Sequence, residues 1–261
     1  MGGTIFTTVD ASIATLTIHN PERHNSLSLQ MWKDAASALE RFAEDDSVRV
    51  VVLTGSGSRS FASGADISEF DQVRATAEAS AGYDASLDRF WKALAGHPKP
   101  TIAMIRGFCL GGGLNIAACC DIRVCGAGSR FAVPAAKLGL GYGATTLRRL
   151  VDLIGPQFAL ELLLTARHVT ANEASAMGLV NRVVDDADVE TSVHEMVQGI
   201  ARNAPLTMLA AKRVVQELLK DSAVRDMAAA EVLVRQCFDS EDYREGRRAF
   251  LEKRTPRFTG R

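Results

Sequence analysis

The sequence predicts an α/β fold in which strands and helices alternate before a helical tail. Two segments, Val48–Leu53 and Thr101–Ile105, are almost continuous apolar runs, which is typical of strands covered on both faces. Residues 29–43 place apolar side chains at steps of three and four, which indicates an amphipathic helix. From about Gln157 onward helical patterns dominate. Three rounds of strand, strand and helix, followed by helices, favour the α/β class.

The elements expected in the first hundred residues are separated by turn-forming residues. Ser12–Ile18 alternates between small or polar and apolar side chains, as a half-buried strand does. Glycine and serine at 55–58 close the strand that ends at Leu53, and glycine and proline at 96–100 close a helix. The expected elements here are strands at 12–18 and 48–53 and helices at 29–43 and 75–94.

The elements expected next surround a run of three glycines. Gly111–Gly113 follows the strand 101–105 and precedes an apolar helix at about 114–120. Further strands are expected at 122–125, 130–133 and 180–184. No stretch of about 18 apolar residues occurs, so we expect no segment that spans a membrane.

The composition is that of an ordinary globular protein, with 47% hydrophobic and 23% charged residues. The 30 basic and 31 acidic residues give a net charge of −1, which disfavours a nucleic-acid-binding role. Five cysteines without a C-x-x-C spacing, and an N-terminus without a signal-peptide pattern, indicate reduced thiols in a cytoplasmic protein. The five histidines are scattered along the chain, so we predict no metal site.

Two glycine-containing loops are the candidate functional segments. One is Phe61–Ile67, and the other is Arg106–Gly113, which leads directly into a helix. Glycine lets a backbone approach a ligand closely, and a helix N-terminus offers unsatisfied N–H donors to negative charge. One N–H group from each loop could hold an oxyanion. The alternative is that both loops are tight turns without a ligand. Neither the G-x-G-x-x-G spacing of dinucleotide-binding folds nor a phosphate-binding P-loop is present.

Several motifs occur together, in one order and spacing, over about residues 10 to 258. They are Asn20–Leu27, Ala62–Ile67, Lys99–Ala103, Gly107, Leu110–Gly113, Cys120–Ile122, Thr170–Ala174, Gly178–Val180 and Phe250–Arg254. This combination resembles the signature of the crotonase superfamily, the enoyl-CoA hydratase/isomerase family.

The resemblance implies a crotonase-like spiral of ββα units with a C-terminal helical region. It implies an acyl-CoA-binding core at 1–195, a helical trimerisation region at 196–261, and a homotrimer or homohexamer. The implied ligand is an acyl-CoA thioester, with coenzyme A as part of the substrate and no permanently bound cofactor. Arg148 and Arg149 are expected at a subunit contact.

The resemblance also assigns site residues. The N–H groups of Ala65 and Gly112 form the implied oxyanion hole, which polarises the thioester carbonyl. The implied contacts to coenzyme A come from Arg23, Ser63, Ala65, Asp66 and Ile67, and from Phe250 and Lys253 of the same or a neighbouring subunit.

Two positions depart from the pattern of family members that hydrate enoyl thioesters. Those members have one glutamate two residues after the triple glycine and another directly after the proline of F-x-x-P-E. Here the two positions are Asn115 and Ala135. Asparagine can orient a water or a carbonyl but cannot take a proton near neutral pH, and alanine can do neither. The standard hydratase mechanism is therefore doubtful, and so is an isomerase mechanism that uses the second glutamate.

Three functions remain open. The first is a hydratase-like enzyme that stabilises a thioester enolate by another route. The second is a decarboxylase-like enzyme using Tyr142, because the superfamily's methylmalonyl-CoA decarboxylase branch has a tyrosine at a similar L-G-x-x-Y position. That match is partial, since the same branch has a histidine where this chain has Ala65. The third is an acyl-CoA-binding protein with little catalytic activity. Tyr142 could equally be a packing residue.

Overall fold

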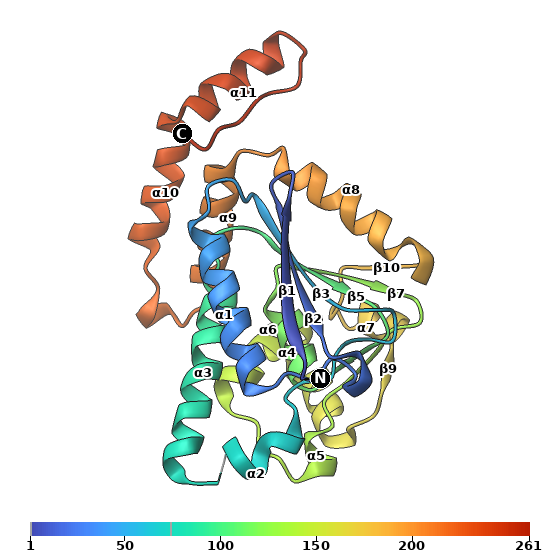
Figure 1. Cartoon of the computed structure of the whole chain (residues 1–261). Helices are drawn as coiled ribbons and strands as arrows, with labels where there is room; N and C mark the ends of the chain where they lie inside the picture. The colour runs from blue at the N-terminus through green and yellow to red at the C-terminus, as the bar shows by residue number, and fades with distance from the viewer. Residues whose placement is uncertain (1, 74) are drawn as a thin grey trace.

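The computed structural model describes residues 2–73 and 75–261 and contains two sheets enclosed by helices (Figure 1). The larger sheet has the strand order β1-β2-β3-β5-β7-β10, and these strands are Thr4–Asp10, Ile13–His19, Val50–Gly55, Thr101–Ile105, Ile122–Gly126 and Arg182–Val184. The smaller sheet has the order β4-β6-β8-β9, with bounds Ser60–Ala62, Phe108–Leu110, Arg130–Ala132 and Val169–Thr170. Only β1 with β2 and β8 with β9 pair antiparallel among the paired strands of the described residues.

The chain winds from one sheet to the other and back. β3 of the larger sheet is followed by β4 of the smaller sheet, β5 by β6, and β7 by β8. Each such pair is followed by helical structure, so the ββ-helix unit repeats along the chain. The α/β class and the spiral of ββα units are therefore confirmed.

Both faces of β3 and β5 in the larger sheet are buried, and side chains alternate between the two faces. Val51 and Leu53 belong to a core shared with α1 (Leu29–Glu44), α4 (Gly112–Cys119) and α6 (Ala144–Thr165). Val50 and Val52 point the other way and pack with the buried valines of α8 (Val189–Ala201). Parallel strands covered on both sides need apolar residues at every position, which explains their continuous apolar runs.

The remaining helices complete the core and form a projecting arm. Around the core lie α2 (Phe70–Val73), α3 (Ala77–Ala95), α5 (Ala135–Leu138), α7 (Ala171–Ala176) and α9 (Pro205–Leu218). The chain ends in α10 (Met227–Asp239) and α11 (Glu241–Leu251), which extend away from the sheets (Figure 1). In the described part of the chain, no helix has both the length and the apolar character needed to cross a membrane.

Three features differ from the expectations. β1 was not predicted because its threonine-rich sequence is mostly exposed and carries little apolar signal. Helix α6 begins at Ala144 rather than near Gln157, and it continues through a kink at Gly155, where φ is 73°. The predicted boundary at 195/196 falls inside α8, so the division into a core and a trimerisation region stays a proposal.

Candidate active site

In the first glycine-containing loop, one backbone N–H group points away from Leu27, the residue that pairs with the loop. Leu27 pairs with this loop in parallel: its N–H donates to Gly64 O at 2.8 Å, and its O accepts from Asp66 N–H at 2.9 Å. Backbone groups of successive residues in an extended chain point to opposite sides. The N–H of Ala65, between those two residues, therefore points away from Leu27.

The second loop turns β6 into α4 within one residue. Gly111 has a φ of 51° and donates its N–H to Ala132 O at 2.8 Å, which fixes the turn to β8. Helix α4 then begins at Gly112, and the first N–H groups of a helix have no partner within it. Among the hydrogen bonds of the described residues, none uses the N–H of Ala65 or of Gly112.

The glycines allow these two backbones to touch. A Cβ atom on Gly113 would lie 2.1 Å from Ala62 O, which no side chain tolerates. A Cβ atom on Gly64 would lie 2.8 Å from Gly112 N, and one on Gly112 would lie 3.6 Å from Ala65 N. The N–H groups of Ala65 and Gly112 are therefore neighbours at the start of a helix, an arrangement that can hold a negatively charged oxygen.

Three of the sequence-predicted side chains lie near Gly111, the residue that precedes the second donor. Asn115 is one turn into α4 and is 4% exposed, and Ala135 is 6% exposed at the start of α5. The hydroxyl of Tyr142 lies 3.6 Å from where a Cβ atom on Gly111 would be. The structure therefore brings Asn115, Tyr142 and the two loops together. Ala135 follows Pro134, whose Cδ lies 3.8 Å from the same Cβ position.

The side chains of Asn115 and Tyr142 form an uncharged polar pair. Burial raises the pKa of Tyr142, and the contact with Asn115 lowers it by less, so the phenol stays protonated at neutral pH. The Oδ1 atom of Asn115 is buried and meets no hydrogen-bond donor among the described residues. Buried polar atoms without a partner are rare in folded proteins, so this carboxamide has capacity left for a ligand or a water.

A cavity of about 740 Å³ begins at Asn115 and follows α4. Its walls come from the end of α3, from α4, from the first turns of α6 and from α9. Apolar side chains in this lining include Trp91, Cys119, Val215 and Leu219, and charged side chains of α3, α6 and α9 line it as well.

The residues predicted to contact coenzyme A form two separate groups. Arg23 donates to Asp66 at 2.8 Å and also to Ser68, and Ser63 donates to Arg23 O at 3.3 Å. Burial would raise the pKa of Asp66, but hydrogen bonds from Ser68 and Arg23 outweigh it and lower the value. Ile67 is exposed beside them. The polar side chains at the rim of the first loop, Arg23, Ser63 and Asp66, are therefore held in place by hydrogen bonds within the chain.

Phe250 and Lys253 make up the second group, at the end of the arm. Phe250 is 83% exposed on α11, and Lys253 follows the helix with a φ of 53°. Figure 1 shows α11 at the opposite end of the molecule from α2, which begins three residues after Ile67. Within one chain, the structure does not bring these two residues to the loops.

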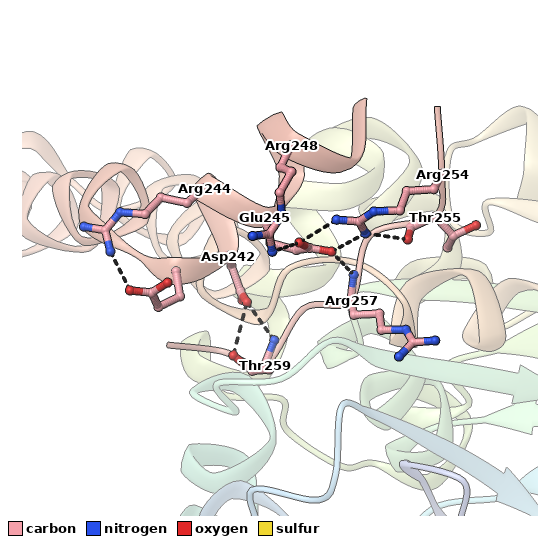
Figure 2. A pocket seen from close by; sticks show the side chains of 9 residues that line it. Asp242, Arg244, Glu245, Arg248, Arg254, Thr255, Arg257 and Thr259 are labelled. Carbon is pink, nitrogen blue, oxygen red and sulfur yellow. Dashed lines mark hydrogen bonds and ion pairs between the residues drawn. The ribbon is translucent and has the colours of Figure 1, made fainter. Parts of the chain in front are cut away.

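A charged pocket in the arm holds the C-terminal tail in place. Glu245 accepts hydrogen bonds from Arg254 and Arg248, each at 2.6 Å, and Asp242 accepts from Thr259 N–H at 2.7 Å (Figure 2). The two arginines lower the pKa of Glu245. These charged groups pair with one another and connect α11 to the C-terminal residues. The charges in this pocket therefore have a structural role in the arm.

Sequence reasoning missed several roles. Glu69 could have been a substitute acid, but its carboxylate accepts from the Leu29 N–H at 2.9 Å and caps α1. Arg149 contacts α4 within the same chain, through Ala118 O at 3.1 Å. No local pattern could reveal these long-range contacts. Among the described residues, no group of three His, Cys, Asp or Glu side chains could hold a metal ion.

Comparisons with known proteins agree on one family. The family model described as "Enoyl-CoA hydratase/isomerase" matches residues 8–261. A short-chain-enoyl-CoA hydratase of Clostridium acetobutylicum is 33% identical over 247 residues, covering 94% of this chain and 93% of the relative. A 2,3-dehydroadipyl-CoA hydratase of Escherichia coli is 33% identical over 250 residues, covering 95% and 96%.

The fold is shared with solved structures as well. The structure of an enoyl-CoA hydratase/carnithine racemase from Magnetospirillum magneticum superposes with a TM-score of 0.94 at 39% identity. The match covers 99% of this chain and 96% of that one. Similarity therefore extends over sequence and structure along nearly the whole chain.

Proposed function

Since the chain belongs to the enoyl-CoA hydratase/isomerase family, we propose that it is an enzyme that stabilises the enolate of an acyl-CoA thioester. The observation that carries this proposal is the pair of unused N–H groups of Ala65 and Gly112. The thioester oxygen accepts both hydrogen bonds, and they strengthen as negative charge develops on it. Loss of one such donor typically lowers kcat by about a hundred- to a thousandfold.

The reaction itself is proposed to differ from ordinary hydration. Adding water to an enoyl thioester requires a group that takes a proton from the water and one that delivers a proton to the α-carbon. Neither Asn115 nor Ala135 can do this near neutral pH. Glu69 is committed to capping α1. We therefore expect a site that holds an enolate well and hydrates crotonyl-CoA poorly.

The position of Tyr142 favours decarboxylation as a second candidate. A malonyl-type thioester loses CO₂ when its C–C bond to the carboxylate breaks and the electron pair moves into the enolate. This step needs the two N–H donors and a carboxylate held out of the thioester plane, but no base. The protonated phenol of Tyr142, beside Gly111, can donate a hydrogen bond to that carboxylate. Water then supplies the proton for the α-carbon.

The third candidate is an acyl-CoA-binding protein with little turnover, which the two N–H donors and the unpaired carboxamide of Asn115 also permit. For all three, we propose that Arg23, Ser63, Asp66 and Ile67 bind coenzyme A at the rim. Phe250 and Lys253 of a neighbouring subunit would reach the same ligand.

A panel of CoA esters tests these candidates. Enoyl, malonyl-type, 3-hydroxyacyl and aromatic thioesters are incubated with the pure protein, and products are identified by mass spectrometry. We expect turnover of at least one ester, with weak hydration of crotonyl-CoA. Loss of CO₂ from a malonyl-type ester that falls in Tyr142→Phe would select the decarboxylase. Binding of esters without any turnover would select the binding protein.

A further inference from the structure

Helix α4 is short and deeply buried. Its eight residues span about 12 Å at 1.5 Å per residue. Leu114, Ile116, Ala117 and Ala118 are all at most 1% exposed, so little water screens charges along it. Aligned peptide dipoles place about half a positive charge at the N-terminus of a helix and half a negative charge at its C-terminus. In so short a helix, the negative end lies close enough to oppose the binding of an oxyanion at Gly112.

Two guanidinium groups bind that negative end. Arg123, from β7 and only 3% exposed, donates to Cys120 O at 2.6 Å and to Leu179 O at 2.8 Å. Arg149, from the second turn of α6, donates to Ala118 O at 3.1 Å. Burial lowers the pKa of Arg123, and the positive charge of Arg149 acts in the same direction.

The charge of this pair is not neutralised locally. Within residues 2–73 and 75–261, neither Arg123 nor Arg149 forms an ion pair with a carboxylate. The adjacent carboxylate, Asp121, is bound by Lys212 at 2.7 Å. With Asp121 and Lys212 taken as a neutral pair, Arg123 and Arg149 leave an excess of about two positive charges at the C-terminal end of α4, and both guanidinium groups bind backbone carbonyl groups there.

We propose that Arg149 and Arg123 are positioning residues for the oxyanion hole. They orient α4 through its last carbonyl groups and cancel its negative pole, which leaves the positive pole at Gly112 unopposed. A unit charge about 12 Å away still acts appreciably on an oxyanion at the effective dielectric constant of about 20 found in proteins. The proposal rests on the proposed function, since it needs a thioester oxygen at Gly112.

Arg148 provides a matched control for Arg149. Both arginines lie on α6 and line the same cavity, but Arg148 binds Asp152 at 3.1 Å and Leu219 O at 2.6 Å instead of α4. Arg149→Met removes the positive charge that contacts the C-terminal end of α4. Arg148→Met removes a positive charge that lines the cavity but does not contact α4. Arg149→Gln can still donate to Ala118 O without a charge, and Arg149→Lys restores the charge. Unfolding in urea is measured for each variant to separate stability from the effect on the site.

The readout is the carbonyl stretching band of bound butyryl-CoA labelled with carbon-13 at the thioester carbonyl. Polarisation by an oxyanion hole moves this band to lower frequency. We expect the shift to shrink in Arg149→Met and Arg149→Gln, and to persist in Arg148→Met and Arg149→Lys. With a turned-over ester, kcat should fall by about fivefold to tenfold in the first two variants, with KM much less affected.

The outcomes separate the two proposals. A wild-type protein that binds butyryl-CoA without any band shift would overturn the oxyanion hole itself, and with it the proposed function. A wild-type shift that survives in folded Arg149→Met and Arg149→Gln would overturn the positioning role alone. An equal loss in Arg148→Met would also overturn it, because the effect would then belong to the cavity and not to α4.

Discussion

Gly64→Ala is the most direct perturbation of the proposed oxyanion hole. The added methyl group would lie 2.8 Å from Gly112 N and 3.6 Å from Leu110 O, between the two loops. Real Cβ atoms do not approach other atoms closer than about 3.0 Å, so the loops must separate. Because the N–H of Ala65 follows directly after Gly64, the separation moves one donor away from the other.

The expected effect of Gly64→Ala has two parts, a loss of stability and a loss of turnover, and the two are measured separately. Gly64 has a φ of 96°, and a side chain in a left-handed conformation costs about 1–2 kcal/mol of stability. Loss of one of two oxyanion donors raises the activation barrier by about 3–4 kcal/mol, a decrease of kcat by about a hundred- to a thousandfold. The second effect should therefore exceed what destabilisation alone could cause in a protein that remains folded.

Gly57→Ala is the matched control for strain. Gly57 has a φ of 72°, but no atom lies within 4 Å of its Cβ position, and it is exposed in the turn after β3. Urea unfolding should show a stability loss from the positive φ in both variants, and a further loss in Gly64→Ala from the contact with Gly112 N. Turnover of the best CoA ester should fall only in Gly64→Ala. If Gly64→Ala keeps turnover within a few fold of Gly57→Ala, the two N–H groups do not form the oxyanion hole.

Three further predictions follow from other parts of the molecule. Asn115→Glu with Ala135→Glu should raise crotonyl-CoA hydration, measured by loss of enoyl absorbance; a wild-type kcat already in the ordinary range of about 1–1,000 per second would contradict the assigned defect. Burial lowers the pKa of His97 to about 4, against 6.5 when unfolded, so the unfolded state takes up the proton first as pH falls. The free energy of unfolding should accordingly drop by up to about 3 kcal/mol between pH 6.5 and pH 4, and His97→Gln should flatten this dependence in urea titrations. The exposed arm carrying Phe250 and Lys253 should assemble the chain into a trimer or hexamer, and sedimentation that shows only monomer at micromolar concentration would refute this.

The tight backbone of the two loops can be recognised in the sequence, because a glycine marks a position where the backbone excludes a side chain or takes a positive φ. Gly64, Gly111 and Gly113 each stand where a Cβ atom would clash or where φ is positive, and each is visible in the sequence without any tertiary information. The apolar strands of the larger sheet were recognised for a similar reason, since burial on both faces leaves an unbroken apolar run.

The cavity and the arginines behind α4 could not be predicted in the same way. Trp91, Asn115, Arg149 and Val215 line one space although they are far apart in sequence and belong to four different helices. Arg149 has the same local sequence character as Arg148, and only tertiary packing decides which of them reaches Ala118. Likewise, whether Asn115 Oδ1 meets a hydrogen-bond donor depends on all the residues packed around it, and among the described residues none donates to it.

The site separates two kinds of chemistry that are supplied by different parts of the chain. The N–H groups of Ala65 and Gly112 belong to the backbone, so their geometry depends on the glycines and on the position of α4, and not on the side chains nearby. Proton transfer, in contrast, depends on the side chains at 115 and 135, and both lack an ionisable group here. In the proposed function, the side chains at these two positions set the reaction, whereas the glycines set the geometry of the two N–H donors. On this proposal, the two loops bind the thioester oxygen, and Asn115, Ala135 and Tyr142 govern the chemistry at the α-carbon of the thioester.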